Sequence, residues 1–309
     1  MHRTSLKAPP APERMIESYR HWIRDARGLT RMTEVDRVRY AKELLAFLVT
    51  RKRTLASATP LDVDAYFAEN SSRWCRLAVR KVCGHLKDFL SYATQRRWCD
   101  RRLGLSIVAP RIYPQEGLPY HAPWSKIVAM LRAAAKDRSG TGRRAYAILM
   151  LLATYGVRSS EVARLELRDI DWREETIFFN RSKGGRNQPL RLVPAVGEAI
   201  LRYVSDARHN ESGSRNLFLR ADAPYAAIGN DVVYATVRKA LKGVGVESAH
   251  LGPHCIRHSF ATHHVNNGRS LKEVSDMLGH RSLESTAVYA KIDLASLREV
   301  AEMNWEGVL

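Results

Sequence analysis

The sequence lacks the patterns of a membrane or exported protein. Its longest apolar run, residues 145–157, is shorter than the roughly 18 residues that a membrane-spanning helix requires. The first fifteen residues contain no apolar stretch of the kind that forms a signal peptide. We therefore expect a cytoplasmic protein with no membrane partner.

Cysteine and the common cofactor motifs are also scarce. The four cysteines, at positions 75, 83, 99 and 255, form no C-x-x-C pair, which argues against a zinc knuckle or a disulfide framework. The chain contains neither the phosphate-binding motif G-x-x-x-x-G-K-[ST] nor the zinc motif H-E-x-x-H. We expect no metal, no ATP and no other cofactor.

Positive charge, by contrast, is abundant. The chain has 50 Lys and Arg against 32 Asp and Glu, a formal net charge of +18 and an isoelectric point near 10.1. Such a balance favours a phosphate-rich partner, with nucleic acid as the first choice and an anionic membrane surface as the rival. The excess is densest in residues 1–110, which hold 22 basic and 11 acidic side chains.

Proline divides the chain into two predicted domains. Four prolines, at positions 110, 114, 119 and 123, fall in a stretch with little helical periodicity, which is typical of an extended linker. The predicted boundaries are a helical domain at 1–107, a linker at 108–122 and a second domain at 123–309.

The first domain shows apolar residues three and four apart, which predicts helices over residues 12–27, 33–52, 59–70 and 73–98. Basic side chains on the fourth helix are expected to contact phosphates along a duplex. These are Arg73, Arg76, Arg80, Lys81 and Lys87.

The second domain predicts helices and one β-hairpin. Alternating or apolar residues lie on both sides of the sequence KGGRN, which places Lys183 at the turn of the hairpin. The fold class is therefore mainly α with a small antiparallel β-sheet (α+β).

The sequence HCIRHSFATHH, residues 254–264, has two interpretations: structural histidines with a surface arginine, which is the default for this helix alone, or an anion site. On a helix His254, Arg257 and His258 share one face, and a guanidinium offers paired donors to two phosphate oxygens. Zinc is disfavoured because Cys255 stands where H-E-x-x-H has its glutamate. Cys255 would make the site sensitive to oxidation if the adjacent positive charges favour its thiolate.

Five motifs in one order now make the chain resemble the tyrosine recombinase (phage integrase) family, in particular its Xer-like and integrase-like branch. They are G-x-R-x-S-E at 156–161, a lysine in a β-turn, H-x-x-R-H at 254–258, L-G-H at 278–280 and a tyrosine nine residues later. Residues 1–107 are more weakly similar to the family's core-binding (SAM-like) DNA-binding domain. The resemblance implies that residues 123–309 form the catalytic domain with a C-terminal helix.

The resemblance also implies a catalytic set. Its members are Arg158, Lys183, His254, Arg257, His280 and Tyr289. In the family the two arginines bind the non-bridging oxygens of the scissile phosphate, and the tyrosine attacks it to form a 3′-phosphotyrosine. The lysine protonates the leaving 5′ oxygen, and the histidines assist proton transfer and hydrogen-bond the phosphate.

Two further residues are implied to support the site. Glu161 would orient nearby site groups, and His258 would buttress Arg257. The chemistry suits these residue types, because the transition state adds charge to the phosphate oxygens and fixed arginines can stabilise that charge in place of metal ions.

The expected function is a site-specific DNA recombinase that cuts and rejoins DNA without metal or ATP, in integration, excision, resolution or transposition. Its expected partners are double-stranded DNA with an inverted-repeat-like site and three further copies of the chain, or related recombinases, on two DNA sites. The helix predicted after residue 292 would join neighbouring copies. A type IB topoisomerase, a non-cutting DNA-binding protein of the same fold and a metal-dependent nuclease remain as alternatives, and the expected location is the nucleoid.

Overall fold

The computed structural model describes residues 6–25, 27–29, 31–112, 120–180, 189–209, 213–248, 251–279 and 286. The chain forms two compact units, Met1–Glu116 and Gly117–Leu309, here called unit 1 and unit 2. Each unit has its own hydrophobic core. The units are described separately.

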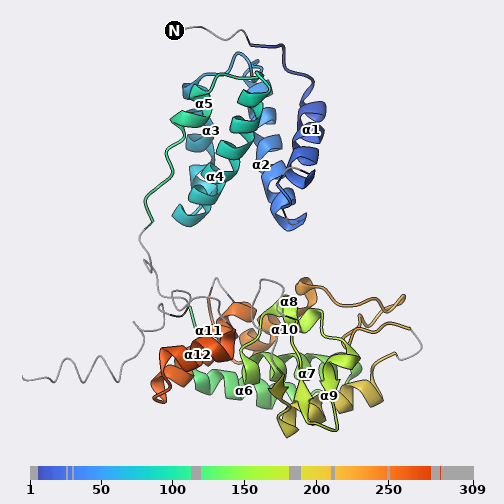
Figure 1. Ribbon diagram of the computed structural model, residues 1–309. Helices are drawn as coiled ribbons and strands as arrows, with labels where there is room; N and C mark the ends of the chain where they lie inside the picture. Colours follow the sequence, from blue (N-terminus) through green and yellow to red (C-terminus); the bar gives the residue numbers. More distant parts are fainter. Residues whose placement is uncertain are drawn as a thin grey trace, which may run out of the picture. The chain divides into compact units, whose positions relative to one another are not determined.

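Unit 1 is helical in the part that the structure describes (Figure 1). Its elements are α1 (Pro12–Asp25), α2 (Arg31–Thr50), α3 (Pro60–Asn70), the 3-10 helix η1 (Ser71–Arg73), α4 (Arg76–Gln95) and α5 (Arg102–Ser106). At the start of α3 the Asp62 carboxylate accepts hydrogen bonds from the backbone N–H and the hydroxyl of Thr59, each at 2.8 Å. This closes the first turn in the manner of a capping box. The helices expected in this part of the chain are therefore present, and α5 is an addition.

The prediction of one helix over residues 73–98 was wrong at its start. Trp74 has extended backbone angles, so Arg73 ends η1 and α4 begins at Arg76. The Trp74 ring packs against the rings of Tyr66 and Phe67 from α3, with centroids 5.9 and 6.1 Å away. Packing of the partly buried indole against these rings overrides the local helical period. Arg73 consequently does not lie on α4.

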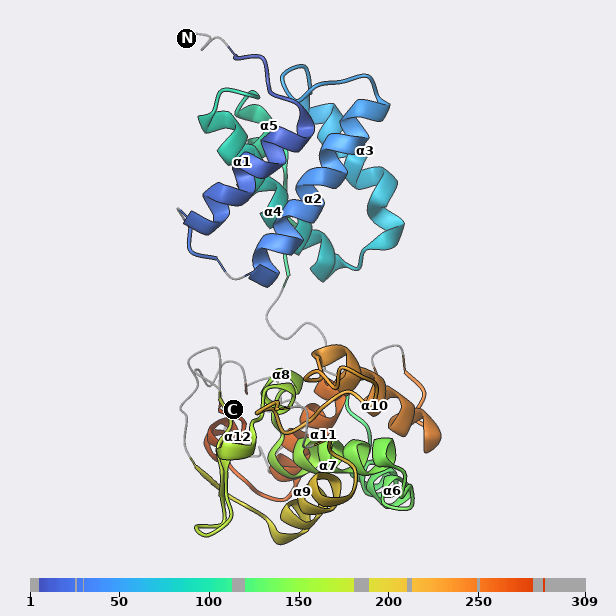
Figure 2. The same cartoon turned by 90° about the vertical axis from the view of Figure 1, so that its right-hand side faces the viewer.

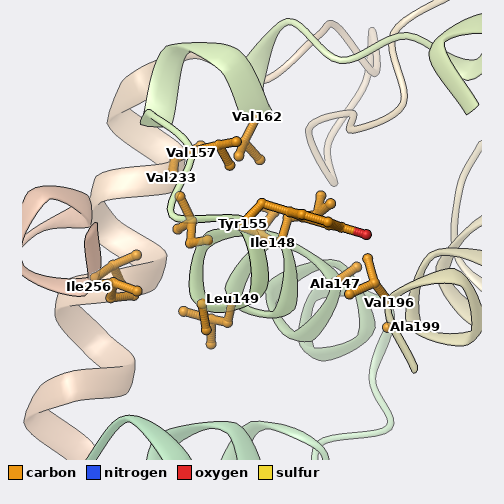
Figure 3. Close-up of a cluster of buried hydrophobic side chains, with 14 of the residues drawn as sticks. Ala147, Ile148, Leu149, Tyr155, Val157, Val162, Val196, Ala199, Val233 and Ile256 are labelled. Atoms are coloured by element: carbon orange, nitrogen blue, oxygen red, sulfur yellow. The ribbon is translucent and has the colours of Figure 1, made fainter. Parts of the chain in front are cut away.

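Unit 2 is built around α7, which contacts α6, α8, α9, α10 and α11 (Figure 2). Its helices are α6 (Trp124–Ala134), α7 (Gly140–Tyr155), α8 (Ser159–Ala163), the 3-10 helix η2 (Leu167–Asp169), α9 (Pro194–Asp206), α10 (Asn230–Gly243), α11 (Pro253–Asn266) and α12 (Leu271–Leu278). Residues on all sides of α7 are buried, as expected of a helix at the centre of a domain. Figure 3 shows part of this core, including Ile148 and Leu149 of α7.

A three-stranded antiparallel sheet completes the described part of unit 2. Its strands are β1 (Ile170–Asp171), β2 (Thr176–Ile177) and β3 (Leu190–Arg191), paired in the order β1-β2-β3. Ile177 pairs with Leu190, so the predicted hairpin is confirmed, whereas Lys183 lies outside the described residues. The expectation of a mainly α fold with a small antiparallel sheet is confirmed. No helix in the described ranges has the length and apolar character needed to cross a membrane.

Candidate active site

Arg257 of α11 is a buried cation held by two helix ends. Its side chain reaches the interior, where the residue is only 4% exposed. Nη1 donates to the Gly156 carbonyl at 2.6 Å, and Nη2 donates to the Leu278 carbonyl at 3.0 Å. These carbonyls lie at the C-terminal ends of α7 and α12, where helices leave acceptors unpaired and carry partial negative charge. The two helix ends therefore fix the guanidinium in position.

Glycine makes this arrangement possible at the end of α7. Gly156 has a φ of +59°, in the left-handed region that favours glycine. A Cβ atom at Gly156 would lie 2.7 Å from Cδ1 of Phe260 and 2.9 Å from Cδ2 of Leu278. Any larger residue would push α11 and α12 away from α7. The glycine thus brings its own carbonyl within reach of Arg257.

Arg158 follows Gly156 by two residues and is held by Glu161. The Arg158 Nη1 donates to one carboxylate oxygen of Glu161 at 2.8 Å, and the Arg158 backbone N–H donates to the other at 2.9 Å. The Glu161 side chain is 2% exposed, whereas that of Arg158 is 31% exposed. The buried carboxylate of Glu161 therefore fixes Arg158 and leaves part of the guanidinium open to solvent.

His254 brings the two arginines into one site. His254 lies three residues before Arg257 on α11, and Arg158 follows by two residues the Gly156 carbonyl that Arg257 binds, so the three residues belong to one region. His254 is exposed at the surface of α11, yet partial desolvation lowers the pKa of its imidazole, and the nearby charges of Arg257 and then Arg158 lower it further. At neutral pH His254 is therefore uncharged, so it has one donor and one acceptor nitrogen.

His258 lies one turn further along α11. Its ring centroid is 6.3 Å from that of His254. Burial, followed by His254, Arg257 and His121, lowers the pKa of His258 to about 4. His258 is therefore neutral at physiological pH and adds no positive charge beside Arg257.

No sequence pattern indicated that His121 lies near the α11 histidines. Residues 120–122 were expected to belong to a linker, yet Ala122 is buried and its carbonyl accepts a hydrogen bond from the Ser259 hydroxyl at 2.8 Å. His121 is adjacent to this contact and influences the pKa of His258. The place of His121 in the site follows from the contact between Ser259 and Ala122, which are 137 residues apart in the chain. No local sequence pattern predicts such a contact.

The condition for an oxidation-sensitive Cys255, a favoured thiolate, is not met. The residue is 2% exposed, and burial raises the pKa of its thiol. Transfer from water disfavours the thiolate more than hydrogen bonding with the Ala122 backbone and the Ser259 side chain favours it. Cys255 therefore contributes packing between α11 and the rest of the core.

Comparison with known proteins identifies the family. The family model of the phage integrase family matches residues 125–295. The chain belongs to the tyrosine recombinase (phage integrase) family.

One relative of this integrase-family chain covers nearly its whole length, and another covers just under two thirds of it. It is 35% identical to "Putative integrase/recombinase y4rA" of Sinorhizobium fredii, over 97% of this chain and 72% of that protein. It is 30% identical to the tyrosine recombinase XerD of Mycobacterium tuberculosis, over 63% of this chain and 62% of that protein.

Solved structures show that the fold is shared with other recombinases. XerH site-specific recombinase bound to its palindromic difH substrate aligns with a TM-score of 0.73 and 18% identity, covering 94% of this chain and 84% of that chain. A lambda integrase dimer bound to a COC′ core site aligns with a TM-score of 0.67 and 14% identity, covering 90% and 76%. At such low identity the likeness concerns the fold alone.

Three members of the expected integrase catalytic set, Lys183, His280 and Tyr289, lie outside the described residues. The segment after residue 292 lies outside them as well. Their roles stay predictions. In the ranges that the structure describes, no three His, Cys, Asp or Glu side chains are grouped closely enough to hold a metal ion.

The basic residues expected to bind DNA fall into three groups. Arg76, Arg80 and Lys87 are exposed, and their spacing of four and seven residues puts them on one side of α4. Lys81 points elsewhere and pairs with Asp36 of α2 at 2.5 Å. Arg73 lies on η1, where its Nη1 donates to the Asn70 side chain.

Proposed function

We propose that the protein is a site-specific DNA recombinase that cuts and rejoins DNA through a 3′-phosphotyrosine on Tyr289, without metal or ATP. The observation that carries the proposal is the buried Arg257, fixed by two helix ends, beside Arg158 and neutral His254. A buried guanidinium held by neutral carbonyls keeps its full positive charge. Such a charge attracts an anion, and a DNA phosphate is the anion that this family handles.

In the proposed first step Tyr289 attacks the scissile phosphorus. The new bond joins the tyrosine oxygen to phosphorus, and the bond from phosphorus to the 5′ oxygen breaks. Lys183 supplies the proton that the leaving oxygen needs. Arg158 and Arg257 stabilise the charge that accumulates on the non-bridging oxygens, while His254 and His280 hydrogen-bond the phosphate and assist proton transfer.

Rejoining reverses these events with another DNA end. The free 5′-hydroxyl attacks the phosphotyrosine, and Tyr289 leaves. Because the phosphotyrosine ester conserves the energy of the broken phosphodiester, resealing needs no nucleotide. A phenol with an ordinary pKa near 10 requires positive surroundings to act as a nucleophile at neutral pH. The two arginines supply such surroundings.

We further propose that residues 1–107 bind DNA through Arg76, Arg80 and Lys87, with weaker contributions from Arg73 and Lys81, and that residues 123–309 carry the catalytic site. Support comes from the exposed basic side of α4 and from fold neighbours that are bound to DNA. One such neighbour is a lambda integrase tetramer bound to a Holliday junction. By analogy, four copies of this chain, alone or with related recombinases, would assemble on two inverted-repeat-like sites through the segment after residue 292.

The test uses nicked duplexes drawn from the DNA that flanks the gene. Wild type and Tyr289→Phe are incubated with them in EDTA, and protein that stays joined to DNA in SDS is measured. We expect an adduct with wild type alone. An adduct with both proteins would identify a different nucleophile.

The adduct assay, together with a plasmid relaxation assay, separates the alternatives. If the protein binds the duplexes in a salt-sensitive way but forms no adduct, the assay is repeated with a random-sequence library. Binding without an adduct there as well would indicate a non-cutting DNA-binding protein. Cleavage that disappears in EDTA would indicate a metal-dependent nuclease. Relaxation of any supercoiled plasmid by a monomer would indicate a topoisomerase.

A further inference from the structure

Tyr155, the last residue of α7, makes two hydrogen bonds through one buried hydroxyl. The residue is 8% exposed. Its hydroxyl donates to the Arg191 carbonyl at 2.9 Å and accepts from the Val193 backbone N–H at 2.9 Å. Figure 3 shows the ring extending from α7 with its oxygen on the side away from Ile256. Both roles of the phenol are therefore used inside the protein.

The partners of Tyr155 belong to both legs of the β2–β3 hairpin. Arg191 ends β3, and Val193 lies two residues after it. On the other leg Phe179, two residues after β2, packs its ring against Tyr155 with centroids 5.5 Å apart. One side chain at the end of α7 thus contacts the chain just after β2 and at the end of β3.

The sheet alone provides little to orient these legs. β2 and β3 have two residues each, and a hairpin of that size is only marginally stable by itself. The Tyr155 hydroxyl binds main-chain atoms, so it fixes the path of the backbone rather than one side chain. Phenylalanine would fill the same space without holding Arg191 and Val193.

Connectivity gives this contact a functional meaning. Residues 181–188, which include Lys183, join the two legs that Tyr155 contacts, and Arg158 follows Tyr155 by three residues. We propose that Tyr155 is a positioning residue, whose hydroxyl fixes the Lys183-bearing hairpin relative to the turn that carries Arg158. The proposal rests on the proposed function, because it assigns the proton donor to Lys183.

The test compares two leaving groups. Tyr155→Phe is assayed on the ordinary nicked duplex and on one with sulfur in place of the bridging 5′ oxygen, whose thiolate leaves without needing a proton. We expect Tyr155→Phe to cleave the oxygen substrate roughly 10- to 100-fold more slowly than wild type, as part of the contribution of a general acid is lost. On the sulfur substrate we expect a rate within about twofold of wild type, with Lys183→Ala rescued in the same way.

The matched control is Tyr203→Phe. Tyr203 on α9 is also buried, and its hydroxyl accepts a hydrogen bond from the Leu219 backbone N–H at 3.1 Å, away from the hairpin legs. This variant loses a similar hydrogen bond, so it should cleave both substrates at the wild-type rate. A defect in Tyr203→Phe equal to that of Tyr155→Phe would reduce the effect to general destabilisation and overturn the proposal.

Other results are equally decisive. Equal slowing of Tyr155→Phe on both substrates, or slowing on neither, would overturn the positioning role. Absence of any adduct with wild type would instead overturn the proposed function. Amide hydrogen exchange then still tests the contact, because Tyr155→Phe should speed exchange in residues 176–193 and Tyr203→Phe should not.

Discussion

Helices α11 and α4 both present arginine to an expected phosphate, yet they do so in opposite ways. Arg257 on α11 is 4% exposed and is held by two main-chain carbonyls. Arg80 and Lys87 on α4 are exposed. A fixed charge suits transition-state stabilisation, because its orientation needs no reorganisation during the reaction. Exposed charges on long side chains suit contacts that follow a DNA backbone and compete with salt.

The contrast has a physical origin in the acceptors. Burying a guanidinium is costly unless its donors are paired, and α11 obtains acceptors from the ends of α7 and α12. The exposed side chains of Arg80 and Lys87 on α4 need no protein acceptors, because water solvates them. The position of the Arg257 charge therefore depends on the fold of unit 2, whereas Arg80 and Lys87 need only the exposed surface of unit 1.

The largest effect is expected at Arg257. Arg257→Lys keeps the charge, but one ammonium cannot span the Gly156 and Leu278 carbonyls and also offer two parallel donors to a phosphate. We expect adduct formation on nicked duplexes to fall by roughly 10²–10³-fold in single-turnover assays. Arg238→Lys, at an exposed position on α10, is the control and should react like wild type. A wild-type rate for Arg257→Lys would show that the paired donors of the buried guanidinium are dispensable.

A second variant keeps Arg257 and changes Gly156, whose carbonyl accepts a hydrogen bond from it. Gly156→Ala places a Cβ atom 2.7 Å from the Phe260 ring at a positive φ, so both strain and overpacking contribute. We expect the free energy of unfolding to drop by roughly 3 kcal/mol in urea titrations.

Gly268→Ala is the matched control for that experiment. Gly268 also has a positive φ, +80°, but nothing lies within 4 Å of its Cβ position. Only backbone strain remains there, and we expect a loss of about 1 kcal/mol. Equal losses for the two variants would contradict the tight packing of α11 and α12 against Gly156.

The neutral state of His258 predicts a pH dependence on the α11 side of the comparison. The folded pKa is about 4, whereas an unfolded histidine has a pKa near 6.5. Between these values the unfolded chain binds the proton and the folded chain does not, so stability falls as the pH drops from 6.5 towards 4. We expect His258 to account for roughly 2–3 kcal/mol of that fall. Urea titrations at several pH values should show a shallower decline for His258→Gln, and parallel curves would refute this assignment.

The smallest effects are expected on α4. Arg80→Ala with Lys87→Ala should lower the slope of log affinity against log salt by about two, as expected for two lost phosphate contacts. Lys81→Ala should change the slope less, because Asp36 already pairs with that lysine. Fluorescence anisotropy at several salt concentrations measures both slopes. An unchanged slope in the double variant, or a slower reaction at saturating protein, would remove these side chains from simple phosphate binding.

Local pattern predicted most of the helices, since apolar residues three and four apart need no knowledge of the partner surface. It failed where a tertiary contact decided the backbone, as at Trp74, whose indole packs against rings of α3 and interrupts the expected helix. It also could not decide the state of the Cys255 thiol, because neighbouring charge is visible in the sequence and burial is not. In the site, motif order indicated Arg158, His254 and Arg257, whereas His121 and Tyr155 required contacts between distant parts of the chain.

The sequence by itself determined the charge balance, the helical periods, the hairpin and the glycines that end α7 and α12. These features depend on residue type and on neighbours within a few positions. The tertiary structure decided which carbonyls hold Arg257, 101 and 21 residues away along the chain, and which strand the Tyr155 hydroxyl binds. Such pairings depend on how whole helices pack, because a hydrogen bond forms only when the cores beneath both partners place them within about 3 Å.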